Sequence, residues 1–181
     1  DAKQFVTRTT ELLAPHGFDA DNTIACVGVC RDELWRSLIS DVVAAWGEAF
    51  NFSSLAGLIT LGRTGFAAAR SHAPRVGGRE RFVLIGMPHI GIDGSGSLGR
   101  VQRRGQQAPS AACGALVLLA DEFRAGVPTT DIDPTDIEQS LLRRRLQPLV
   151  RKDGPVEIAE LTRLMRRAIL EDLERLLAGS D

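Results

Sequence analysis

The stretch from Asn22 to Glu33, NTIACVGVCRDE, decides the fold, because an apolar run stops abruptly at three charged residues. Residues 22–30 are apolar, partly β-branched and too short for a typical helix, so they predict a buried strand. The sequence that follows, LWRSLISDVVAAWGEAF, has apolar residues at helical spacing, namely Leu34, Leu38, Val42 and Trp46. Strand, polar turn and helix in this order predict the first unit of an α/β fold.

The rest of the chain supplies further elements of both kinds. Residues 55–62 and 81–87 predict two more strands, and residues 3–14 predict a helix ended by Pro15 and Gly17. The segment SAACGALVLLADEFRAG predicts a helix that stops at Gly126. Two amphipathic helices, over 134–150 and 155–177, close the sequence. We therefore expect one α/β domain over residues 1–181, with a helical C-terminal third over 134–178.

The composition narrows the class of protein. With 181 residues and a formal net charge of -1, the chain offers no general electrostatic case for binding nucleic acid or a membrane. No apolar run is long enough to span a bilayer, and no export leader is visible. Three scattered cysteines argue against a disulfide framework and favour a reducing compartment such as the cytoplasm. The basic runs at 143–145 and 166–167 fit solvated helix faces better than a partner surface.

A glycine-rich loop follows the strand predicted at 81–87, and its glycines match G-x-G-x-x-G at Gly94, Gly96 and Gly99. A dinucleotide site needs a helix directly after such glycines, so that the helix N-terminus holds the pyrophosphate. The sequence RVQRRGQQAPS follows instead, and it cannot start an amphipathic helix. We therefore interpret this loop as a wrap around a site near His89 and not as a phosphate cradle.

Three residues at element ends have the chemistry of zinc ligands. Cys30 ends the first strand, His89 lies just past another strand, and Cys113 begins a helix. Strand ends of a parallel sheet converge on one edge, and a helix N-terminus favours a thiolate. Two thiolates and an imidazole leave a fourth position for water, which is the arrangement of a catalytic zinc.

The other cysteine and histidines are poorer candidates. Four strand residues span about 13 Å, so Cys26 and Cys30 cannot share one ion, and Cys26 reads as a buried, inert thiol. His16 lies between proline and glycine and reads as a turn residue. We expect His72 at a loop or helix end. Cys113 as a nucleophile paired with His89 would leave Cys30 without a role.

The motifs together are similar to those of a known family. CRDEL at 30–34, GMPHIGIDGSGSLGR at 86–100 and RRGQQAPSAACGAL at 103–116 resemble the low-CO2-inducible LCIB/LCIC-type proteins, a lineage of β-type carbonic anhydrases. The resemblance implies a β-carbonic-anhydrase-like mixed sheet flanked by helices, a homodimer, and zinc held by Cys30, His89 and Cys113. It also implies interconversion of CO2 and bicarbonate by attack of zinc-bound hydroxide on CO2, with Asp32 as the aspartate of the C-x-D motif.

One departure from the wider motif concerns the partner of Asp32. The pattern C-x-D-x-R would place an arginine at position 34, where this sequence has Leu34. The arginine that positions Asp32 must come from elsewhere, and the candidates are Arg31, Arg36 and a loop arginine such as Arg104. We take Asp32 and Arg31 as the expected catalytic residues. Val29, Leu34 and Ile90 are expected walls of the CO2 pocket. The alternative to an enzyme is a catalytically silent zinc-binding homologue that acts through association with partners.

Overall fold

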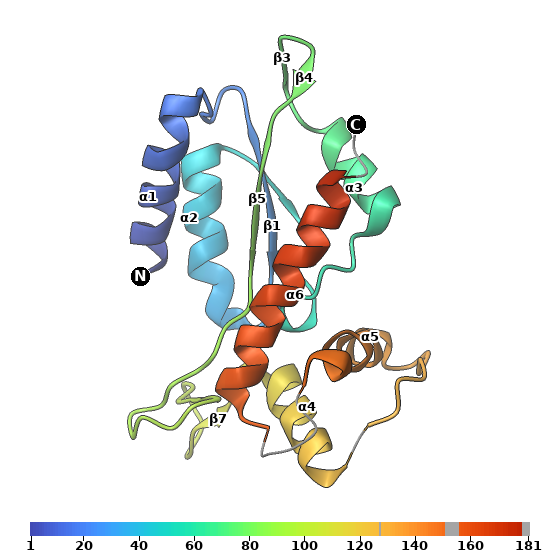
Figure 1. The fold of residues 1–181 in the computed structure, drawn as a ribbon. Helices are drawn as coiled ribbons and strands as arrows, with labels where there is room; N and C mark the ends of the chain where they lie inside the picture. Colours follow the sequence, from blue (N-terminus) through green and yellow to red (C-terminus); the bar gives the residue numbers. More distant parts are fainter. Residues whose placement is uncertain (127, 151–155, 179–181) are drawn as a thin grey trace.

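The fold is an α/β arrangement around a short parallel sheet (Figure 1). The computed structural model describes residues 1–126, 128–150 and 156–178. The central sheet has the order β2-β1-β5, and both pairings are parallel. Antiparallel pairing occurs in two short hairpins, β3–β4 and β6–β7. The strands are β1 (Ile24–Val29), β2 (Ala49–Asn51), β3 (Arg75–Val76), β4 (Arg79–Glu80), β5 (Phe82–Met87), β6 (Arg100–Val101) and β7 (Ser110–Ala111).

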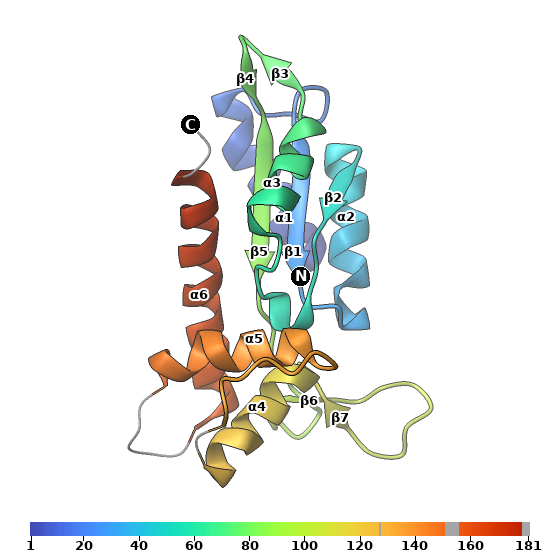
Figure 2. The ribbon, with the colours of Figure 1, turned by 90° about the vertical axis from the view of Figure 1, so that its right-hand side faces the viewer.

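Helices cover both faces of the sheet (Figures 1 and 2). On one face α1 and α2 pack on β1 and form a core with Val27, Leu38 and Val42. On the other face lie α3 and α6, while α4 and α5 lie below the carboxyl ends of the strands (Figure 2). The helices are α1 (Ala2–Leu13), α2 (Arg36–Trp46), α3 (Gly62–Ser71), α4 (Gly114–Ala125), α5 (Ile137–Leu146) and α6 (Ile158–Ala178).

The strand β1 occupies the centre of the sheet because its sequence has no polar face. All six residues, IACVGV, are buried, as expected for a parallel strand covered on both sides. Gly28 is required by packing, because a Cβ atom there would lie 2.1 Å from the ring of Phe52. Gly86 of β5 plays the same part for α6, since a Cβ atom would lie 2.9 Å from Ile169.

The predicted α/β class, the first strand with the helix after it and the strand at 81–87 are confirmed, and the α1, α4, α5 and α6 regions are helical as expected. Within the predicted 155–177 helix, Pro155 lies outside the described residues.

The predicted strand at 55–62 is wrong. Residues Leu55–Gly57 form a 3-10 turn in which Ala56 and Gly57 have positive φ, and the strand lies earlier, at Ala49–Asn51. The apolar character of this segment comes from packing: Ala56 and Leu58 are buried in the core below the sheet. A short apolar run was therefore misread, because burial alone does not distinguish strand from turn.

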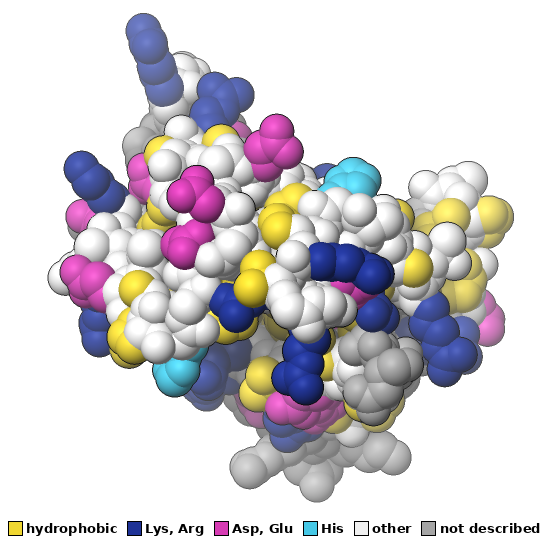
Figure 3. Space-filling model, turned by 90° about the horizontal axis from the view of Figure 1, so that it is seen from above, with side chains coloured by type: hydrophobic (Ala, Val, Ile, Leu, Met, Phe, Trp, Pro, Cys, Tyr) yellow, Lys and Arg dark blue, Asp and Glu magenta, His cyan; other side chains and the backbone are white. Residues whose placement is uncertain are grey.

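Two features bear on charge clustering and on membrane insertion. At the end of the molecule opposite the carboxyl ends of the strands, basic and acidic side chains are interspersed (Figure 3). Among the described residues, no helix has the length and apolar character needed to cross a membrane.

Candidate metal centre

Three side chains from separate elements meet at the carboxyl edge of the sheet. Cys30 directly follows β1, His89 lies two residues after β5, and Cys113 is the N-cap of α4. The neighbouring strands β1 and β5 pair in register at Val29 and Met87, which brings their following residues to one edge. The ligand atoms of the three side chains all lie within 4.8 Å of one another. The structure thus brings together the three residues that the sequence singled out.

The geometry of this cluster fits a metal ion. The Sγ atoms of Cys30 and Cys113 are 3.6 Å apart, and two sulfurs on one tetrahedral zinc, each about 2.3 Å from it, are about 3.8 Å apart. His89 Nε2 is buried and has no hydrogen-bond partner among the described residues. A buried ring nitrogen without a partner is costly unless it binds something else. The donor set, two sulfurs and an imidazole nitrogen, is one that zinc prefers.

Electrostatics favour one thiolate in the pair. The hydrogen bond from Cys113 lowers the pKa of Cys30, and the neighbouring His89 and the backbone at Asp32 act in the same direction against burial. The pKa of Cys113 is raised, first by its contact with Cys30 and then by burial. Two thiolates this close repel each other in the absence of a cation. A divalent metal would remove that conflict and allow both sulfurs to be thiolates.

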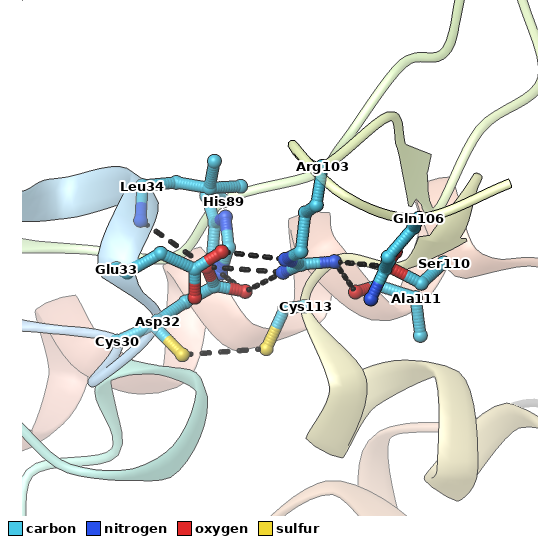
Figure 4. A network of polar contacts seen from close by, with 10 residues as sticks. All are labelled: Cys30, Asp32, Glu33, Leu34, His89, Arg103, Gln106, Ser110, Ala111 and Cys113. Atoms are coloured by element: carbon cyan, nitrogen blue, oxygen red, sulfur yellow. Dashed lines mark hydrogen bonds and ion pairs between the residues drawn. The ribbon is translucent and has the colours of Figure 1, made fainter. Parts of the chain in front are cut away.

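Asp32 lies beside the cluster and is held by Arg103 (Figure 4). Its Oδ2 is 3.8 Å from His89 Nε2 and 3.2 Å from Arg103 Nη2. Asp32 Oδ1 also accepts a hydrogen bond from the backbone N–H of Leu34. The carboxylate is therefore fixed from two sides next to the candidate metal ligands.

None of the arginine candidates from the sequence contacts Asp32 among the described residues. Arg31, which we had paired with Asp32, instead binds Glu138 through a 2.7 Å ion pair and donates to the backbone carbonyl of Ser53. Arg36 lines a surface hollow, and Arg104 is exposed; neither makes an ion pair with a described residue. Arg103, one residue before Arg104, is the arginine that pairs with Asp32.

Arg103 connects the strand-end residues to the β6–β7 hairpin (Figure 4). It donates to Glu33 as well as to Asp32, and its Nη1 donates to Ser110 Oγ and to the carbonyl of Ala111. Arg103 and Arg104 are adjacent and of the same type, so composition cannot choose between them. The choice depends on the hairpin pairing, in which Val101 lies opposite Ser110.

The glycine loop touches the cluster only at its base. Gly91 N donates to the carbonyl of Ala112, and Gly99 N donates to the carbonyl of Gly91. Beyond that, Asp93 Oδ1 accepts from the backbone of Ser95 and Ser97, which closes an exposed turn. A short strand, β6, and no helix follows Gly99, so the requirement for a dinucleotide site is not met. The expected wrap of the glycine loop around the candidate metal ligands is thus limited to the segments flanking this turn.

The remaining cysteine and histidines lie where the sequence suggested. Cys26 is buried in the middle of β1, and burial raises its pKa to about 11. His16 ends a short 3-10 turn, and His72 is the C-cap of α3. None of the three belongs to the candidate metal cluster.

A surface hollow of about 500 Å³ adjoins Cys30 and Asp32. Its other lining residues are Arg31, Glu33, Arg36, Ile39, Asn51 and Ser53. The expected walls Val29, Leu34 and Ile90 do not line it: Val29 is fully buried, and Ile90 packs against the core below the sheet. Charged and polar residues therefore make up most of the lining of this hollow beside Asp32.

The fold and the cluster define an α/β protein with a Cys–His–Cys site at the carboxyl edge of a parallel sheet. The sequence model of the limiting CO2-inducible proteins B/C, described as β-carbonic anhydrases, matches residues 1–181. The chain belongs to this family.

Solved structures agree with this assignment. The crystal structure of PtLCIB4, a homologue of the limiting CO2-inducible protein LCIB, is 28% identical and superposes with a TM-score of 0.81 over 97% of this chain and 73% of its own. The crystal structure of LCIB itself is 29% identical, with a TM-score of 0.75 over 99% of this chain and 77% of its own. No curated protein shows a significant sequence match.

Proposed function

We propose that this chain is a zinc-dependent carbonic anhydrase that interconverts CO2 and bicarbonate. The observation that carries the proposal is the meeting of Cys30, His89 and Cys113, with one buried imidazole nitrogen left without a partner. Membership of a family described as β-carbonic anhydrases supports the reaction class. Cys30 Sγ, His89 Nε2 and Cys113 Sγ would hold the zinc.

Zinc, when bound, supplies a Lewis acid that makes water a nucleophile at neutral pH. The protein's own part is positioning. Asp32 Oδ2 lies within 3.8 Å of His89 Nε2 and is placed to accept a hydrogen bond from a water molecule in the site. Arg103 holds that carboxylate in one orientation, and Glu33 and Ser110 in turn hold Arg103. A fixed acceptor orients a lone pair of the water oxygen toward its substrate without a reorganisation cost.

The experiment that tests this proposal is stopped-flow CO2 hydration by the purified protein and its Cys30→Ala variant, with zinc content recorded for both. We expect hydration by the wild type, and loss of hydration together with zinc in the variant. Bound zinc without hydration, under reducing and oxidising conditions alike, would refute the enzyme and leave a silent zinc-binding homologue.

Three further features stay predictions. We propose that residues 1–181 form one domain, that the protein is a homodimer, and that it resides in the cytoplasm or another reducing compartment. Three free cysteines, all buried, agree with a reducing compartment. Sedimentation velocity tests the dimer, and limited proteolysis tests the single domain.

A further inference from the structure

The first turn of α5 reaches both elements that carry the sulfurs of the candidate metal site. This helix lies below the carboxyl ends of the strands, together with α4 (Figure 2). Glu138 contacts the segments beside Cys30. Its neighbour Gln139 contacts the first turn of α4, which begins directly after Cys113. Neighbouring residues of an α-helix point about 100° apart, so a single turn of α5 touches two sides of the cluster.

The backbone on either side of Cys30 is held by the segment that follows β2. Ser54 N donates to the carbonyl of Val29, and the carbonyl of Ser54 accepts from Arg31 N. These two hydrogen bonds flank Cys30 and form the bridge that pairs it with Ser54. The 3-10 turn Leu55–Gly57 follows Ser54 directly. The place of Cys30 therefore depends on where this turn lies.

Glu138 fixes that turn through a backbone contact. Leu55 N donates to Glu138 Oε2 over 2.8 Å. The next residue, Ala56, has a φ of 56°, a left-handed conformation that alanine keeps only where its surroundings hold it. Glu138 Oε1 also accepts from Arg31, but the side chain of Arg31 is largely exposed, so this ion pair adds little. Glu138 therefore acts on Cys30 through Leu55.

Gln139 holds the side of the cluster that carries Cys113. Its side chain is buried, and its Nε2 donates to the carbonyl of Ala115 over 3.3 Å. Ala115 lies in the first turn of α4, and the backbone N–H groups of Ala115 and Leu116 interact with the Cys113 sulfur. A buried amide is costly where an apolar side chain would serve the core. The contact with α4 explains why Gln139 is polar.

The rest of α5 is anchored so that its first turn has a fixed place. Leu142 and Leu146 are both fully buried and belong to the core below the sheet. Ala56 and Leu116 belong to the same core cluster, so α5, the 3-10 turn and α4 pack as one unit. Groups on the first turn of such a helix keep a fixed separation.

We propose that Glu138 and Gln139 are positioning residues that together set the distance between the two sulfurs of the candidate metal site. The inference rests on the zinc site proposed above. The sulfurs are 3.6 Å apart, and one tetrahedral zinc requires about 3.8 Å. Glu138 holds the turn beside Cys30, and Gln139 holds the helix that presents Cys113. Neither side chain binds the metal or the substrate.

The test measures the zinc affinity of the full chain by competition with a chromogenic chelator. Glu138→Ala should bind zinc about tenfold more weakly, the low end of the loss that follows removal of a residue behind a ligand. Gln139→Met keeps the side-chain volume and removes the donor, and we expect a similar loss. Glu138→Gln retains an oxygen that accepts from Leu55 N and should bind as the wild type does. Arg31→Ala, which leaves the contact with Leu55 in place, should also bind normally.

A second control separates positioning from stability. Leu146→Ala creates a cavity at the far end of α5 and lowers stability, but it should keep the wild-type zinc affinity. With Co²⁺ in place of zinc, the visible absorption bands should shift in Glu138→Ala and stay unchanged in Leu146→Ala, because only the former distorts the ligand set.

Wild-type affinity in both Glu138→Ala and Gln139→Met would overturn the proposal. So would an equal loss in Leu146→Ala, since the affinity would then follow stability. A wild type that binds no zinc would overturn both this proposal and the proposed function. Because the affinity assay contains no CO2, a wild type that binds zinc without hydrating CO2 would refute the enzyme alone, and the tenfold losses would still support the positioning role.

Discussion

Cys26 lies inside β1 and Cys30 directly follows it, and their pKa values are shifted in opposite directions. Both are buried, at 1% and 5% exposure. Burial raises the pKa of Cys26, whereas the hydrogen bond from Cys113 lowers that of Cys30. Residue type and burial are shared, so the difference comes from position: Cys26 lies between strands, and Cys30 lies where β1, β5 and α4 meet. The pKa of a cysteine in this molecule therefore depends on whether it lies inside a strand or at the end of one, beside other elements.

The largest expected effect sharpens this comparison. Cys113→Ala should weaken zinc binding by more than the roughly 10–100-fold that follows loss of a partner behind a ligand, because it removes a ligand itself. Cys26→Ala should bind zinc as the wild type does, since Cys26 is not in the cluster. Competition with a chromogenic chelator measures both affinities. Equal losses in the two variants would refute the assignment of ligands by position.

The second comparison concerns two leucines on α4. Leu116 has 0% exposure and belongs to the core below the sheet, whereas Leu118 has 50% exposure. Leu116→Ala should lower the free energy of unfolding by about 2–5 kcal/mol, and Leu118→Ala by no more than about 0.5 kcal/mol. Urea unfolding followed by circular dichroism measures both. Similar values for the two would show that the helix below the sheet is not packed as described.

The third comparison separates two adjacent arginines. Arg103→Ala should lower CO2 hydration by about 10–100-fold, because Asp32 loses the group that orients it, while bound zinc is retained. Arg104→Ala should leave both unchanged. Stopped-flow rates, normalised to zinc content, decide the matter. A larger loss from Arg104→Ala would restore the candidate that the sequence first suggested.

The smallest effect is expected at Arg31. Its ion pair with Glu138 is largely exposed on the arginine side, at 59% for that side chain. Arg31→Ala should therefore cost no more than about 1 kcal/mol of stability, and hydration per bound zinc should not change. Thermal unfolding and the same kinetic assay measure these. A loss of hydration equal to that of Arg103→Ala would show that Arg31 takes part in catalysis.

The sequence predicted the parts of the site that element ends determine. Cys30, His89 and Cys113 each adjoin a clear strand or helix, so their meeting followed from the rule that parallel strands end on one edge. Arg103 was missed because it lies in a hairpin of two-residue strands, whose register no local pattern reveals. The misplaced second strand has a similar cause: Ala56 and Leu58 are apolar because α4 and α5 cover them, which is a tertiary effect.

The sulfurs of Cys30 and Cys113 meet across 83 residues of chain. A ring of that size carries a closure entropy that only tertiary structure can offset. Because they come first in the sequence, Cys30 and His89 leave the ribosome before Cys113 is synthesised. The helix α4, which begins at Cys113, packs against α5 and α6, which are synthesised later still. If the cluster holds zinc as proposed, metal capture would be a late step in biogenesis, and the zinc content of a preparation would report how many molecules have finished folding.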